Sequence, residues 1–133
     1  MRKFTTKERQ TMKVIICGDR KWTDRQMIEE YMQGLPVDTL IIQGECAGAD
    51  RIAKQIAKKL YLPVTDKYAA NWELHGLAAG PIRNRQMLKE NPDLVVAFHD
   101  NLALSKGTKD MLNAAKQAGV KTLVFSHNST LLE

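Results

Sequence analysis

Short apolar runs alternate with helix-patterned segments along most of this chain, and this alternation limits the folds open to it. There are five such runs, each four to six residues long: Met12–Cys17, Thr39–Ile42, Leu62–Thr65, Leu94–Phe98 and Val120–Phe125. Runs of this length and composition favour buried strands. Strand and helix in strict alternation predict an α/β domain, in which right-handed crossovers build a parallel sheet with helices on both faces.

The segment from Ala49 to Leu60 has the clearest helical pattern, with apolar residues on one narrow face and basic residues opposite. Similar spacing predicts helices after Asp24, from Pro81 to about Asn91, and from Thr108 until Gly119 ends the helix. We therefore expect one Rossmann-like domain over residues 12–125, with five parallel strands in the order 3-2-1-4-5. A flexible basic arm at 1–11 would precede it, and a C-terminal tail at 126–133 would follow.

The net charge of +5 over 133 residues suits an anionic partner. Much of the excess lies in the arm, where Arg2, Lys3, Lys7 and Arg9 outnumber Glu8. We expect no contact with a membrane, because no apolar run approaches the roughly 20 residues of a membrane span. No secretory signal is recognisable, and two cysteines without ligand-like spacing predict reduced thiols in a cytoplasm.

The stretch from Gly80 to Arg85 poses an electrostatic question. Pro81 suits the first turn of a helix, but Arg83 and Arg85 place positive charge where the helix dipole is already positive. We interpret this as a site for a phosphate-bearing ligand near Arg83 and Asn84, with Arg85 on another face of the helix.

The loops after the strands supply further candidates, because ligands of such sheets bind at the carboxyl ends of the strands near a topological switch point. Gly18, Arg20 and Trp22 follow the first strand; either they form a tight turn with Arg20 solvated, or Gly18 admits a ligand that Arg20 or Trp22 contacts. After the second strand, Gly44 and Gly48 bound a turn that resembles a phosphate-cradling loop.

Three candidates each have two interpretations. Asp50 would repel a phosphate, so it is expected to bind a ribose hydroxyl or the loop backbone. Gly107 and Thr108 begin a helix beside two lysines, which suits a phosphate, although Thr108 could simply cap the helix. Trp72 is either a surface lid residue or a plane for stacking a base.

Catalytic and metal chemistry is less evident in the sequence. Cys46 has no recognisable dyad partner for a nucleophile. His75, His99 and His127 are scattered without a carboxylate or cysteine at metal spacing, so we expect no metal site and no cofactor.

Four ordered motifs together resemble the YspA/YpsA-related branch of the SLOG superfamily over residues 12–125. They are Gly18-Asp19-Arg20-x-Trp22-x-Asp24, Gly44-x-x-x-Gly48-Ala49-Asp50-x-x-Ala53, Trp72-x-x-x-Gly76-x-x-Ala79-Gly80-Pro81-x-Arg83-Asn84-x-x-Met87, and Ala97-Phe98 with Gly107-Thr108. The resemblance implies a Rossmann-like sheet, a pocket for a nucleotide, nucleotide sugar or NAD-derived ligand such as ADP-ribose, and a homo-oligomer. Within the pocket it implies that Arg83 faces the phosphate, and on that reading Asn84 lies near the ribose. It also implies a location in a bacterial or phage-infected cytoplasm.

The same superfamily contains the LOG phosphoribohydrolases and the Smf/DprA proteins, which suggest two alternatives. The first is hydrolysis of a nucleoside monophosphate, but the LOG glutamate position falls on Met111 here. Arg83 would then bind phosphate, and Asp19, Glu45 or Asp110 would have to supply the carboxylate. The second alternative is binding of single-stranded DNA, which rests on the basic arm and the net charge.

Overall fold

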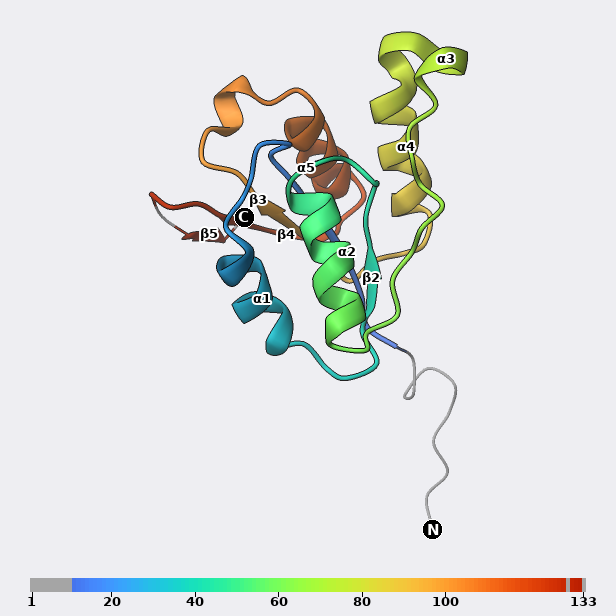
Figure 1. The fold of residues 1–133 in the computed structure, drawn as a ribbon. Coiled ribbons are helices and arrows are strands. Elements are labelled where there is room, and N and C mark those ends of the chain that lie inside the picture. Colours follow the sequence, from blue (N-terminus) through green and yellow to red (C-terminus); the bar gives the residue numbers. More distant parts are fainter. Residues whose placement is uncertain (1–10, 129, 133) are drawn as a thin grey trace.

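A computed structural model describes residues 11–128 and 130–132, so the predicted basic arm lies outside the described residues except for its last residue. Four parallel strands form the body of the sheet (Figure 1). They are β2 (Leu40–Ile42), β1 (Lys13–Gly18), β3 (Leu94–Phe98) and β4 (Lys121–Phe125), in that spatial order. This is the order predicted for the first, second, fourth and fifth apolar runs.

The parallel part of the sheet has four strands, whereas the sequence predicts five. The expected third strand, Leu62–Thr65, makes a single bridge, between Val64 and Ile41. Pro63 has no backbone N–H to give to a ladder. Beyond the bridge, a side chain rather than a neighbouring strand bonds to this segment: Nε2 of Gln43 donates to the carbonyl of Thr65 at 2.8 Å.

At the other edge of the sheet, residues after β4 turn back and pair with it. The short strand β5 (Thr130–Leu132) runs antiparallel to β4, with Val124 opposite Leu131. The sequence predicts a tail over 126–133, so part of that tail is a strand. The complete sheet therefore has a mixed edge beside a parallel body.

Each face of the sheet is covered by two helices, as predicted (Figure 1). Alternate side chains of β1 show the division: Val14 and Ile16 enter one apolar cluster, while Ile15 and Cys17 enter the other. The first cluster includes residues of α1 (Arg25–Gln33) and α2 (Ala49–Lys59), and the second includes residues of α4 (Ala79–Leu88) and α5 (Gly107–Gln117). Gly119, with φ of +77°, follows α5 as the sequence predicts.

The segment before α4 is more broken than predicted. The helix expected from Pro81 to Asn91 begins at Ala79 and ends at Leu88. It is preceded by α3 (Trp72–His75) and the 3-10 turn η1 (Gly76–Ala78), which are separated by the positive φ of Gly76. A second 3-10 turn, η2 (Leu102–Leu104), precedes α5.

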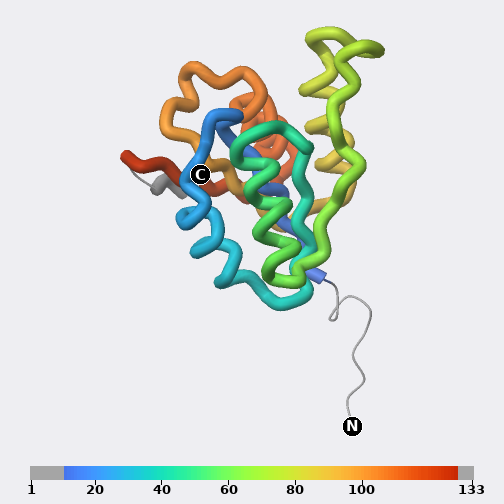
Figure 2. The backbone as a smooth tube through the Cα atoms, in the orientation of Figure 1, coloured from blue at the N-terminus to red at the C-terminus, as the bar shows by residue number. Residues whose placement is uncertain are grey.

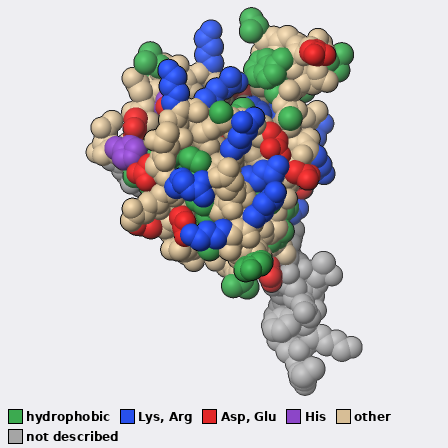
Figure 3. Space-filling model, in the orientation of Figure 1, with side chains coloured by type: hydrophobic (Ala, Val, Ile, Leu, Met, Phe, Trp, Pro, Cys, Tyr) green, Lys and Arg blue, Asp and Glu red, His purple; other side chains and the backbone are tan. Residues whose placement is uncertain are grey.

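The α3–η1 segment projects from the body of the molecule (Figure 2). None of its residues is buried. Hydrophobic side chains gather at this projecting end in Figure 3, and Leu74 and Leu77 are 71% and 94% exposed. Elsewhere, no helix among the described residues is long and apolar enough to cross a membrane.

Candidate functional site

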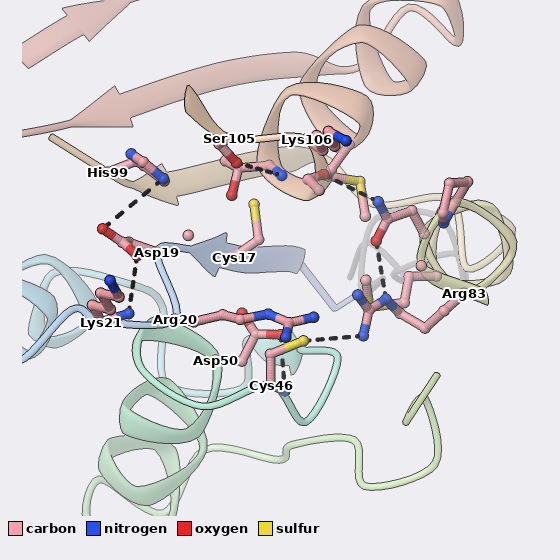
Figure 4. A pocket seen from close by; sticks show the side chains of 18 of the residues that line it. Cys17, Asp19, Arg20, Lys21, Cys46, Asp50, Arg83, His99, Ser105 and Lys106 are labelled. Atoms are coloured by element: carbon pink, nitrogen blue, oxygen red, sulfur yellow. Dashed lines mark hydrogen bonds and ion pairs between the residues drawn. The ribbon is translucent and has the colours of Figure 1, made fainter. Parts of the chain in front are cut away.

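A pocket of about 560 Å³ opens at the carboxyl ends of β1 and β3 (Figure 4). Its walls come from the loop after β1, the loop between β2 and α2, the α3–η1–α4 segment, and the loop between β3 and α5. The chain leaves β1 toward β2 on one side, whereas β3 lies on the other side, so the pocket is at the predicted switch point.

Most of the candidate ligand-binding residues line this pocket. Those that do are Gly18, Arg20, Asp50, Trp72, Gly80, Arg83, Asn84, Gly107 and Thr108, and the catalytic candidate Asp19 joins them. Trp22, Gly44 and Gly48 do not line it. The first is a core residue, and the two glycines shape the loops behind the wall.

Arg83 is held in the pocket wall with only 7% of its surface exposed. Its Nη1 donates to the carbonyl of Gly44 at 2.6 Å, and its Nε donates to Oδ1 of Asn84 at 3.0 Å. No hydrogen bond to a described residue engages Nη2. No fully buried polar side-chain atom in the described chain lacks a partner, so Nη2 keeps accessible surface, and Arg83 lines the pocket.

Gly44 leaves the space that the Arg83 guanidinium occupies. A Cβ at this position would lie 2.4 Å from Nη1 of Arg83 and 2.8 Å from its Cζ. Gly48 has a different role: its φ is +78°, and a Cβ there would lie 2.2 Å from the carbonyl oxygen of Asp19. Both glycines thus position loops, and neither lines the pocket.

Arg85 faces away from the pocket and pairs with Asp110 on α5 at 2.9 Å. The amide of Asn84 also donates to Asp110, at 3.0 Å, so this carboxylate joins α4 to α5. Glu45 is likewise engaged outside the pocket, with Lys54 at 2.9 Å. Neither Asp110 nor Glu45 is therefore placed to serve as the carboxylate of the pocket.

Asp50 is buried, and its Oδ2 accepts from the amide of Gly44 at 3.0 Å and from that of Cys46 at 3.4 Å. The loop-backbone interpretation of this residue is therefore the one the structure shows. Burial raises the pKa of Asp50 to about 6, while the nearby Arg83 charge and the two amides oppose this rise.

The two tryptophans have separate places. Trp72 is 46% exposed at the pocket, and the guanidinium of Arg20 lies 5.8 Å from its ring centroid. Trp22 is 5% exposed in the core, and its Nε1 donates to the Asp24 carbonyl at 2.9 Å. The ligand contact proposed for Trp22 is therefore wrong, because its ring packs against Phe98 and His127.

The start of α5 also differs in detail from expectation. The sequence suggested that the side chain of Thr108 caps this helix. In the structure the side chain of Ser105 makes the capping bond instead, because its Oγ accepts from the amide of Thr108 at 3.0 Å. Lys106 and Gly107 line the pocket beside it. Met111 also lines the pocket, where its thioether side chain replaces the carboxylate of the LOG pattern.

Several pocket residues were missed from the sequence, above all Cys17 and His99. Both lie at the carboxyl ends of strands, and that position is the signal that could have found them. Burial raises the pKa of Cys17 far above its ordinary value, so its thiol stays protonated. Among the described residues, no three His, Cys, Asp or Glu side chains lie together in a way that could hold a metal ion.

Residues 12–75 match the model of the YspA, cpYpsA-related SLOG family. The Gene 61 protein of Mycobacterium phage D29 is 30% identical over 121 residues, which span 85% of this chain and 95% of that protein. The X-ray structure of DNA processing protein A (DprA) from Streptococcus pneumoniae has the same fold, with a TM-score of 0.65 and 17% identity. The similarity covers 86% of this chain, but the chain spans only about half (50%) of the DprA chain.

Proposed function

Because this chain belongs to the YspA, cpYpsA-related SLOG family, we propose that its pocket binds a nucleotide or nucleotide-derived ligand, such as a nucleoside monophosphate or ADP-ribose. The observation that carries the proposal is the guanidinium of Arg83, which is fixed by Gly44 and Asn84 and leaves Nη2 accessible from the pocket. A preorganised arginine at the carboxyl ends of parallel strands is well suited to a phosphate group.

The charge and size of the pocket support a ligand of this class. Four cationic side chains line it, from Arg20, Lys21, Arg83 and Lys106, against the carboxyl groups of Asp19 and Asp50. The volume of about 560 Å³ lies within the range of about 300–1,000 Å³ that is usual for small-molecule sites.

A base would stack on Trp72 at the mouth of the pocket. The ring is half-exposed, and Gly80 lies beside it, since a Cβ built on Gly80 would be 3.5 Å from Cη2 of Trp72, an ordinary contact distance. Arg20 approaches the same ring and adds a cation beside it. Aromatic planes of this kind bind any base, so they define the nucleotide class and not the base.

The test is the ligand-induced change in melting temperature. With AMP or ADP-ribose at about 100 times its dissociation constant, we expect a rise of roughly 5–10 °C. Arg83→Ala should abolish this rise. Arg85→Ala is the matched control, because it removes an arginine of the same helix that pairs with Asp110 outside the pocket.

Arg83→Ala also removes the hydrogen bond to Gly44, so its own melting temperature is expected to fall. The ligand-induced rise is therefore compared within each variant. Lys106→Ala provides a second test on an exposed side chain of the pocket, and it should weaken the rise without a large change in the unliganded protein. A wild-type protein indifferent to a broad nucleotide panel contradicts the proposal.

Single-stranded DNA is the second candidate, because the half-exposed Trp72 and its neighbour Arg20 combine stacking with positive charge. Such binding should weaken steeply as salt increases. Turnover has less support, since Met111 stands at the position of the LOG glutamate and Asp110 is paired with Arg85. Chromatography of AMP incubated with the protein should then show no free adenine above background.

A further inference from the structure

The loops after β1 and β3 bring Asp19 and His99 to the same wall of the pocket (Figure 4). Gly18 is the register partner of Phe98, and the amide of Asp19 donates to the carbonyl of Phe98 at 2.9 Å. The amide of His99 in turn donates to Phe125 on β4 at 3.0 Å. Backbone bonds therefore fix both residues, which are 80 positions apart in the sequence.

The ring of His99 presents an N–H to the pocket. Its Nδ1 lies 3.0 Å from the amide nitrogen of Asn101. A backbone amide can only donate, so Nδ1 accepts and the proton of the neutral ring is on Nε2. No hydrogen bond to a described residue uses Nε2, and no fully buried polar side-chain atom in the described chain lacks a partner. Nε2 therefore keeps accessible surface, and His99 lines the pocket although it is only 8% exposed.

Asp19 presents the complementary acceptor. Its Oδ1 accepts from the amide of Lys21 at 2.9 Å, which orients the carboxylate. Its Oδ2 lies 4.0 Å from Nε2 of His99, a separation too long for a hydrogen bond. The pair lies at an ion-pair distance, drawn as a dashed line in Figure 4, but without a hydrogen bond between the two side chains, so it offers one donor and one acceptor side by side.

A hydroxyl group matches this pair, because it accepts one hydrogen bond and donates another. A phosphate does not match, since Asp19 would repel it, and the base of the ligand is already assigned to the ring of Trp72. We propose that Asp19 and His99 recognise a ribose hydroxyl of the bound ligand, which makes the site selective for ribonucleotides over deoxyribonucleotides. This inference rests on the proposed function.

The position of the pair agrees with an extended ligand. In Figure 4, Asp19 and His99 lie on one side of the view and Arg83 lies on the other, so sugar and phosphate contacts are separated. Asp50 and Asn84, which the sequence suggested for the ribose, are engaged with loop amides and with Arg83 and Asp110. Ribose recognition therefore moves to the β1 and β3 loops.

Calorimetric titration of AMP, 2′-deoxy-AMP and 3′-deoxy-AMP tests the inference. We expect wild-type protein to bind AMP at least about tenfold more tightly than one of the two deoxy analogues, because that analogue leaves donor and acceptor unpaired. Asp19→Asn and His99→Asn should reduce this ratio toward one, mainly by weakening AMP binding.

The choice of variants separates recognition from folding. His99→Asn retains a polar atom near the Nδ1 position but lacks Nε2, whereas His99→Gln places an amide N–H near Nε2 and should restore part of the ratio. Asp38→Asn and His127→Gln are matched controls outside the pocket and should keep the wild-type ratio.

Three results overturn the inference. The first is a wild-type protein that binds all three nucleotides with equal affinity, while Arg83→Ala abolishes the binding of each. In that case the proposed function stands and only the ribose inference fails. The second is an equal loss of affinity for AMP and both deoxy analogues in Asp19→Asn and His99→Asn. The third is a wild-type protein that binds none of the three nucleotides. If it does not bind ADP-ribose either, the proposed function is contradicted as well.

Discussion

Arg83 connects the start of α4 to the loop after β2 while it leaves one nitrogen accessible from the pocket. Its guanidinium depends on the missing side chain of Gly44, where a Cβ would lie 2.4 Å from Nη1. We expect Gly44→Ala to lower the free energy of unfolding by about 1–3 kcal/mol, because the arginine must shift. The variant should also lose most of the nucleotide-induced stabilisation.

Urea denaturation measures the first effect, and Gly34→Ala is a matched control. Gly34 has φ of −84°, and a Cβ there meets its nearest atom, the Tyr31 carbonyl oxygen, at 3.5 Å, an ordinary contact. This control should change stability little. A Gly44→Ala protein as stable as wild type, with unchanged ligand response, would contradict the role assigned to Arg83.

Asp50 makes stability depend on pH, because burial raises its pKa from an ordinary value of 3.8 to about 6. The folded chain holds this proton more tightly than the unfolded chain. The resulting stabilisation is fully present below about pH 4 and is lost as the pH rises through about 6. Asp50→Asn stays neutral throughout, so its stability relative to wild type should increase by up to about 3 kcal/mol from pH 4 to pH 7.

Unfolding free energies of both proteins at about pH 4, 5.5 and 7 provide the check. Effects of other titrating groups are shared by the two proteins and cancel in the difference. A difference that stays constant across this range would mean that Asp50 titrates normally in the folded state.

At the scale of elements, His127 joins the segment after β4 to two other parts of the chain. Its ring stacks on Trp22 with centroids 4.7 Å apart, and its two nitrogens each lie 2.8 Å from a carboxylate, that of Asp100 on one side and that of Asp24 at the start of α1 on the other. The hydrogen bond that the ring donates to Asp100, followed by the one that it donates to Asp24, raises the pKa of His127.

This arrangement predicts a pH-dependent cost of removing His127. A raised pKa means that the stabilisation is present below the ordinary value of 6.5 and is lost as the pH rises through the folded-state value. His127→Gln should therefore lower the melting temperature more at about pH 6 than at about pH 9. Differential scanning fluorimetry compares the two, with His75→Gln on the exposed α3 as control; an equal cost at both values would contradict the prediction.

The elements themselves were largely predictable, because apolar runs and helical spacing are local features. The exceptions have physical causes. Pro63 cannot donate to a ladder, so the expected third strand is reduced to one bridge. The backbone of Gly76, with φ of +57°, separates α3 from the turn before α4.

The site was predictable in place but not in detail, because details depend on contacts between distant segments. The loops after the strands, the charges near the start of one helix and the family motifs together indicated the pocket, and nine of the twelve candidate ligand-binding residues line it. That Arg83 lies against Gly44, or that Asp19 faces His99, depends on packing and register across β1 and β3. Trp22 was misassigned because nothing in its local sequence shows that its ring enters the core.

At the scale of the whole molecule, the homo-oligomer implied by the family resemblance stays a prediction. The projecting α3–η1 segment exposes Leu74 and Leu77 to water, and a second copy of the chain would remove this apolar surface. Light scattering coupled to gel filtration should then give a multiple of 15.0 kDa. Leu74→Glu, outside the pocket lining, should shift it toward the monomer; a monomeric wild-type protein would end this expectation.

The central claim is that one pocket holds a nucleotide whose phosphate contacts Arg83. A crystal structure of the protein grown with AMP or ADP-ribose tests it in a single measurement. We expect phosphate oxygens within about 2.7–3.2 Å of Nη2 of Arg83, with the base over Trp72. An ordered ligand bound elsewhere, or an empty pocket at saturating nucleotide, would contradict the claim.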